Sequence, residues 1–287
     1  MTIDQIFNLM VVIFTVSNLG AMGLELEVRE SARIFRNPRF VLLTLSWGWL
    51  VGPAIAWLII AIIPLQEAHA AGLMLISLAP TAPFFPMMVR RARADTPFAA
   101  SFMLLTTMGT VVLLPLLAPL LVKGVTVSVM ALAKPMLAMV LLPLLIGSFI
   151  RTVAGPIAAK LFPVVKKIGG MSTLIVLVMT LAMYGDEMLG AIGSYAPGSQ
   201  VLFFVLMATL AYRFGFGLPQ RQRSGMALGM CTRNIAAVFA AYLGILNPPD
   251  GLFVSIILVI PLTLIVALVA ARIFSGQAAT GLTDSAT

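Results

Sequence analysis

One arginine lies in the middle of an apolar stretch that contains no acidic residue to neutralise it. This residue, Arg233, belongs to the segment 225–243, which has no Asp or Glu. An arginine at the centre of a membrane helix costs about 2.5–3.5 kcal/mol on insertion scales, so it usually faces a protein interior or a wet cavity and marks a functional site. Three roles are open for it: binding an anionic substrate, replacing a bound metal cation, or hydrogen bonding to the carbonyls of a broken helix.

The residues around this arginine are suited to a binding site. Thr232 and Asn234 flank it, and an Asn amide both donates and accepts hydrogen bonds. Gly229 comes four residues before Arg233, so the two share a face if the stretch is helical, and the glycine would leave space beside the guanidinium. Gly225 and Gly229 also form a small-residue pair that lets another helix approach closely. We therefore expect residues 229–234 to line a site.

A second interrupted stretch lies in the other half of the chain, where three prolines recur at intervals of three residues. Each proline removes a backbone donor and disfavours helix in the residue before it, so a continuous helix is not expected. A break of this kind exposes helix ends, and helix N-termini favour anions. The residues expected to line the same site are Pro80, Thr81, Pro83 and Pro86, together with Thr106 from a later segment.

The composition indicates the class of protein that contains these residues. Of the 287 residues, 61% are hydrophobic and 10% are charged, and the mean hydropathy is +1.08. A soluble domain has about 45–50% apolar and about 25% charged residues, so we expect an integral membrane protein in contact with the lipid bilayer. One cysteine and one histidine give neither a disulfide framework nor a metal site. The spans contain no carboxylate pair and no activated nucleophile, so an enzyme is not expected.

Apolar segments of about 20 residues are long enough to cross a bilayer, and the sequence contains nine of them. They predict an all-α polytopic membrane protein with nine transmembrane helices. The loops are too short for a soluble domain, so a single transmembrane transporter domain is expected over 1–287. The predicted spans are 6–24, 40–63, 70–88, 98–122, 131–150, 170–188, 200–216, 225–243 and 252–273.

Basic residues alternate between the loops of this predicted topology. Most of the 18 Lys and Arg residues fall on one side, and the positive-inside rule makes that side cytoplasmic. The N-terminus is then outside and the C-terminus is cytoplasmic in a multi-pass protein of the plasma (inner) membrane. Because the basic residues are spread over short loops, topology explains the pI near 10.3, and nucleic acid is not expected as a partner.

The order of the spans suggests an internal symmetry. Spans one to four and spans six to nine form two sets, inverted relative to each other, and the interrupted segments are equivalent, third and eighth. Paired broken segments in inverted halves are the best sequence indication of a transporter's binding site. The expected division is a first repeat at 5–122, a connecting span at 130–152, a second repeat at 156–274 that opens with an interfacial helix, and a disordered tail at 275–287.

Several short motifs occur along the chain in an order that is found in one family of transporters. They are Met22-Gly-Leu-Glu-Leu-Glu27, Leu75-Ile-Ser-Leu-Ala-Pro80, Thr106-Thr107-Met-Gly-Thr110, Leu114-Pro115-Leu-Leu-Ala-Pro119 and Gly217-Leu-Pro219. In these motifs the chain resembles the bile acid:sodium symporter family, part of the bile/arsenite/riboflavin transporter superfamily. The resemblance implies a core domain and a panel domain built from inverted repeats, with two unwound helices that cross at the membrane midplane.

The resemblance also implies which positions bind sodium in that family, and these positions are replaced here. The family's Glu-x-Gly-x-Gln-Asn motif corresponds to residues 229–234, where Gly229 and Arg233 replace the Glu and the Gln and Asn234 is retained. Loss of a carboxylate and gain of a cation disfavour sodium, because like charges repel strongly at short range in a low dielectric. The other replaced positions are Gly48, Phe85 and Pro86.

The sequence therefore predicts a secondary transporter of small organic anions that works by alternating access, without sodium coupling and without a metal or cofactor. Two alternatives stay open: a sodium-coupled symporter with a different sodium site, and a membrane sensor or structural subunit that binds a ligand without moving it. The carboxylates of Glu25 and Glu27 are expected in a loop beside Arg29 and Arg33.

Overall fold

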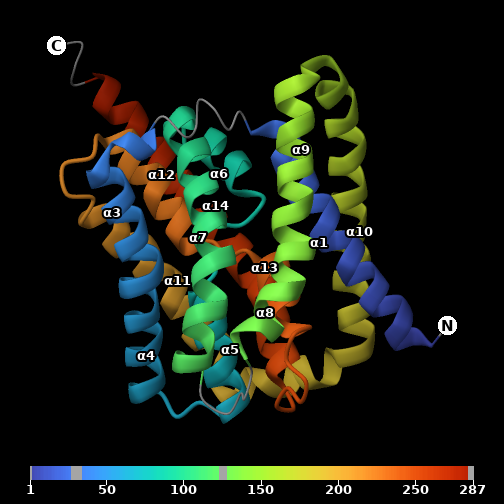
Figure 1. Cartoon of the computed structure of the whole chain (residues 1–287). Coiled ribbons are helices and arrows are strands. Elements are labelled where there is room, and N and C mark those ends of the chain that lie inside the picture. Colours follow the sequence, from blue (N-terminus) through green and yellow to red (C-terminus); the bar gives the residue numbers. More distant parts are fainter. Residues whose placement is uncertain (1, 27–33, 123–127, 284–287) are drawn as a thin grey trace.

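The protein is built from helices (Figure 1). The computed structural model describes residues 2–26, 34–122 and 128–283, and within these ranges no β-strand is formed. Six helical stretches in the described chain are long and apolar enough to cross a membrane. The prediction of an all-α polytopic membrane protein is therefore confirmed. The two interrupted segments lie between further helices, which are shorter or less apolar.

Two of the six stretches contain a π-helical turn. The first consists of α3 (Pro38–Ser46), η2 (Trp47–Val51) and α4 (Gly52–Ile62), and the second of α8 (Val129–Met136), η3 (Leu137–Leu141) and α9 (Leu142–Val153). The other four are α1 (Ile3–Glu25), α7 (Thr96–Leu121), α10 (Gly155–Ala191) and α14 (Leu252–Thr283). The remaining helices are η1 (Ile34–Arg36), α5 (Glu67–Ser77), α6 (Phe85–Arg91), η4 (Ile192–Ser194), α11 (Ala196–Arg213), α12 (Gln220–Cys231) and α13 (Ile235–Tyr242).

Three long helices pack together on one side of the molecule. The α1 helix contacts both α9 and α10, which also contact each other, and Figure 1 shows them side by side. The backbones of α1 and α9 meet directly, because a Cβ placed on Gly23 would overlap the carbonyl oxygen of Leu144. We call α1, α8–α9 and α10 the three-helix group. The other helices, α3 to α7 and α11 to α14, form the larger group.

Two predicted details of this architecture differ from the structure. The expected interfacial helix before the sixth span is the first part of α10, which runs without interruption from Gly155 to a kink at Tyr184. This part of α10 packs on α1, where Asn18 Nδ2 donates to the carbonyl oxygen of Gly169 at 3.4 Å. At the other end, α14 runs on to Thr283 instead of ending before a disordered tail at 275, and residues 284–287 lie outside the described part.

Several arginines gather at one end of the molecule. Arg90 and Arg91 lie in the last turn of α6, Arg151 lies in the last turn of α9, and Arg213 lies in the last turn of α11. These helix ends lie toward the top of Figure 1, near the start of α12. We call this the basic end. Its assignment to the cytoplasmic side stays a prediction.

Candidate functional site

Both predicted interruptions are present, and they lie against each other. Helix α5 ends at Ser77 and α6 begins at Phe85, while α12 ends at Cys231 and α13 begins at Ile235. An isolated antiparallel bridge joins Pro80 of the first break to Arg233 of the second. The two segments that the sequence singled out, far apart in the chain, therefore form one crossing.

Backbone hydrogen bonds between the two breaks hold this crossing together. The N–H of Thr81 donates to the carbonyl oxygen of Thr232 at 2.9 Å, and the N–H of Asn234 donates to that of Ala79 at 2.8 Å. The N–H of Ala82 donates to the hydroxyl oxygen of Thr232 at 3.2 Å. Thr81 has a left-handed backbone with φ of 72°. Groups that an unbroken helix would satisfy internally are thus satisfied by the other break, as the interior of a membrane requires.

Side chains from two further helices bond the carbonyls at the ends of the interrupted helices. Trp49 Nε1 donates to the carbonyl oxygen of Leu78 at 2.9 Å. The hydroxyl of Thr263 donates to the carbonyl oxygen of Cys231 at 3.1 Å. The final turns of α5 and α12 are therefore bound from η2 and α14, and the crossing is held from outside as well as by its own backbone.

The side chain of Arg233 is buried at the crossing without a hydrogen-bond partner. Its exposed fraction is 0%, and none of its three guanidinium nitrogens bonds to any described residue. The guanidinium carbon lies 4.7 Å from the ring centroid of Phe203 on α11, which is a cation–π arrangement. The third predicted role, a guanidinium that bonds the broken-helix carbonyls, is wrong because backbone N–H groups and the Trp49 and Thr263 side chains do this.

Asn234 contributes a second unsatisfied donor next to the buried arginine in the chain. Its Oδ1 accepts a hydrogen bond from the N–H of Ala237 at 3.1 Å, so the side chain caps the start of α13. Its Nδ2 has no partner among the described residues. Buried polar groups are nearly always hydrogen-bonded in folded proteins. The second break therefore contains unused donors and a positive charge, which together favour an anion.

The predicted role of Gly229 is wrong in one respect. The helix ends at Cys231, so Gly229 and Arg233 do not lie on one helical face. A Cβ placed on Gly229 would overlap the ring of Phe102 on α7. The absence of a side chain at this position accommodates that aromatic ring, and it does not provide space beside the guanidinium.

Thr106 makes its hydrogen bonds within α7 and not with the crossing. Its hydroxyl donates to the carbonyl oxygens of Phe102 at 2.9 Å and Met103 at 3.1 Å. A buried threonine commonly uses its hydroxyl in this way. The structure therefore links Thr106 to its own helix.

The other predicted positions divide between the crossing and a pocket at the basic end. Gly48 lies against the first break, since a Cβ there would be 3.4 Å from Cγ of Pro80. Phe85 is fully buried, and Pro83 lies in the turn that precedes α6. Pro86, in the first turn of α6, lines the pocket.

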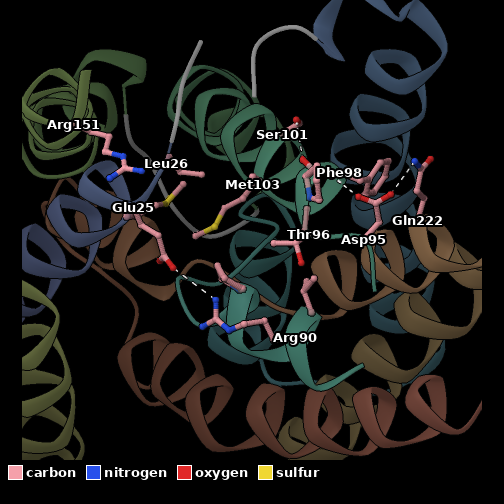
Figure 2. A pocket seen from close by; sticks show the side chains of 16 residues that line it. Glu25, Leu26, Arg90, Asp95, Thr96, Phe98, Ser101, Met103, Arg151 and Gln222 are labelled. Atoms are coloured by element: carbon pink, nitrogen blue, oxygen red, sulfur yellow. Dashed lines mark hydrogen bonds and ion pairs between the residues drawn. The ribbon is translucent and has the colours of Figure 1, made fainter. Parts of the chain in front are cut away.

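This pocket has a volume of about 710 Å³ and lies between α1, α6, α7 and α9 (Figure 2). Its size is typical of sites for small molecules. In one part of its lining, Glu25 Oε1 of α1 lies 3.7 Å from Arg90 Nη1 of α6. Its apolar lining includes Met22, Leu26, Val89, Phe98 and Met103, and its polar lining includes Glu25, Arg90, Asp95, Thr96, Ser101, Arg151 and Gln222.

Asp95 has a structural role at the edge of this pocket. One carboxylate oxygen accepts from the N–H of Phe98 at 2.8 Å and so caps α7. The other oxygen accepts from Nε2 of Gln222 at 3.3 Å. The two bonds join the start of α7 to α12, as Figure 2 shows. Both partners of this carboxylate therefore belong to the larger group.

Sequence reasoning missed the pairing of Glu25 with Arg90. Glu25 is the last residue of α1 and reaches across the pocket to α6, where a loop beside Arg29 and Arg33 had been expected. Glu27, Arg29 and Arg33 lie outside the described residues. The available signal was an acidic residue at the end of an otherwise apolar span, but nothing local indicated its partner.

These features define a class, a helical membrane protein in which two interrupted helices cross and hydrogen-bond each other. The model of the Sodium Bile acid symporter family matches residues 10–191, and the chain belongs to that family. This confirms the resemblance found in the sequence. The matched range contains the break between α5 and α6 and ends before the break that carries Arg233.

A curated relative supports the same assignment. The chain is 24% identical over 226 residues to the probable sodium/metabolite cotransporter BASS3, chloroplastic, of Arabidopsis thaliana. The aligned region covers 78% of this chain and 52% of the relative. The chain therefore spans about half the length of that protein. A symporter family and a cotransporter relative agree with the prediction of a transport protein and not an enzyme.

Proposed function

We propose that this chain is a secondary transporter of small organic anions that works by alternating access without sodium coupling. The observation that carries the proposal is the guanidinium of Arg233, which is fully buried at the crossing and has no described hydrogen-bond partner. In this proposal it is a tethered cation that permanently supplies the charge that sodium supplies in coupled relatives. No resident metal or cofactor is needed.

The surroundings of the second break support the loss of sodium. Two positive charges about 5 Å apart repel by about 3 kcal/mol at an effective dielectric constant of 20, so Arg233 disfavours a sodium ion beside it. The carboxylate that the family resemblance places at position 229 is absent. The ring of Phe102 lies where a side chain at that position would begin. The site has thus lost an anionic ligand and has no space in which to regain one.

The helix arrangement supports a mechanism in which two bodies move against each other. We interpret the three-helix group as the panel domain and the larger group as the core domain. In this proposal the described part of the chain has nine transmembrane segments in two inverted repeats. They are the six long stretches, α11, and the pairs α5–α6 and α12–α13, each pair counted as one crossing segment. The pocket between the groups would then open to the cytoplasm at the basic end, with the N-terminus outside and the C-terminus inside.

The first test is the thermal stability of the purified protein in detergent. Sodium is compared with potassium and choline at equal ionic strength, across a panel of organic anions, for the wild type and Arg233→Gln. A ligand that binds the native state raises the melting temperature. We expect an anion to stabilise the wild type regardless of the cation and to have a weaker effect on Arg233→Gln. Arg91→Gln, which removes an exposed arginine of α6, is the control.

The alternatives give different results in the same experiments. Stabilisation of the wild type by sodium alone would show a sodium site elsewhere and refute the loss of coupling. Anion uptake into proteoliposomes separates a transporter from a sensor or structural subunit. Ligand-dependent stabilisation with no uptake of the same anion would support the sensor and contradict transport.

A further inference from the structure

One ion pair links the two helix groups across the pocket at the basic end. Glu25 ends α1, which belongs to the three-helix group, and Arg90 lies in α6, which packs on α7, α12 and α14 of the larger group. Glu25 Oε1 and Arg90 Nη1 are 3.7 Å apart. This is a single contact beyond hydrogen-bonding distance, so the arginine is held loosely.

The side chains of this pair face open space. Arg90 is 53% exposed and Glu25 is 36% exposed, and both line the pocket. An exposed pair of this kind is a weak interaction because water screens both charges. A guanidinium has five N–H donors in a planar fork that can bind both oxygens of a carboxylate. Arg90 therefore has binding capacity that Glu25 does not use.

The pocket provides an apolar wall near this arginine. Met22 and Leu26 at the end of α1 and Met103 of α7 line it. Figure 2 shows the side chain of Met103 between Glu25 and Thr96 at the start of α7. A molecule with an anionic group and an apolar body matches this combination of a charge and an apolar surface. Asp95, the other described carboxylate of the lining, is bonded to Phe98 and Gln222 and does not reach Arg90 in Figure 2.

We propose that Arg90 recognises the anionic group of the transported molecule, and that Glu25 competes with that group for the same guanidinium. This rests on the proposed function, since it names the residue of the pocket that selects organic anions. A bound carboxylate replaces Glu25 on Arg90, so ligand binding removes the ion pair that joins α1 to α6. Recognition of charge is thereby coupled to the separation of the two helix groups.

The test is the equilibrium binding of two probes, octanoate and phenylbutanoate, each compared with its uncharged primary amide. The variants are Glu25→Gln, Arg90→Gln and the double variant. The matched controls are Arg91→Gln on the same helix and Glu187→Gln, both at exposed positions outside the pocket.

We expect Glu25→Gln to bind the carboxylates about two- to fivefold more tightly, because it removes a weak competing ion pair. Arg90→Gln is expected to bind them at least about tenfold more weakly, because hydrogen bonds to charged groups are lost. In the double variant the gain from Glu25→Gln disappears, which is the signature of two residues acting on one contact. The amides and the control variants show none of these changes.

Three results would overturn the inference. The first is equal tightening for a carboxylate and its amide, which would mean that Glu25→Gln changes the shape of the pocket and not the competition for charge. The second is a gain that persists in the double variant. The third is binding of neither carboxylate by the wild type. Anion transport that depends on Arg233 but not on Arg90 or Glu25 would leave the proposed function intact while refuting this inference.

Discussion

Replacement of Arg233 by methionine should make the protein more stable while removing its response to anions. Leaving a buried charge without a partner destabilises a protein by about 3–5 kcal/mol, and the guanidinium of Arg233 has no described hydrogen-bond partner. Its cation–π contact with Phe203, at 4.7 Å, offsets about 2 kcal/mol of that destabilisation. The replacement should then raise the free energy of unfolding by about 1–3 kcal/mol, because the apolar methionine side chain suits its apolar surroundings.

The measurement is the melting temperature in detergent without added organic anion. At about 2–4 °C per kcal/mol for a protein of this size, Arg233→Met should melt roughly 2–12 °C above the wild type. Arg91→Met, at an exposed position of α6, should melt within about 1–2 °C of it, because exposed substitutions usually change stability by less than about 0.5 kcal/mol. A lower melting temperature for Arg233→Met would refute the reasoning, because it would show that the guanidinium makes stabilising contacts.

Three further substitutions test a glycine contact and a helix cap at the crossing, and a glycine contact within the three-helix group. Gly229→Ala should destabilise by about 1–3 kcal/mol in chemical denaturation, because the new Cβ overlaps the ring of Phe102. Gly23→Ala should lower the melting temperature because its Cβ meets the backbone of α9, whereas Gly170→Ala, with open space at its Cβ, should not. Asn234→Ala should destabilise by about 1 kcal/mol through loss of the cap on α13, and an unchanged melting temperature would contradict that role.

The positions of the two breaks were predictable because they depend on local chemistry. The proline repeat excludes a continuous helix wherever it occurs, and an unpaired arginine in an apolar segment marks a special site in any fold. That the breaks meet was implied by the family resemblance, but the atoms that join them were not. The hydroxyl of Thr232 accepts from the N–H of Ala82, a residue 150 positions away, and no local pattern encodes such a contact.

The roles of individual side chains were less predictable than the positions of the breaks. Gly229 was expected to open space for the guanidinium, but the helix ends between them and Phe102 of another helix occupies the position. The partner of Glu25 was missed for a similar reason, since Arg90 is brought to it by the packing of α6 and α1 around the pocket. In each case the residue in contact is distant in the chain, so the local periodicity and charge pattern cannot predict the contact.

The hydrogen bonds between the breaks also constrain how the chain is made. The N–H of Ala82 has its partner on Thr232, 150 residues later, and at about 5–20 residues per second synthesis of that length takes roughly 8–30 s. During this interval the first break has no protein partner from the second, and hydrocarbon cannot satisfy its free backbone groups. The segment from α5 to α6 must therefore stay in contact with water or with the insertion machinery until α12 and α13 arrive. The two halves of the protein complete each other late, after the ribosome has synthesised most of the chain.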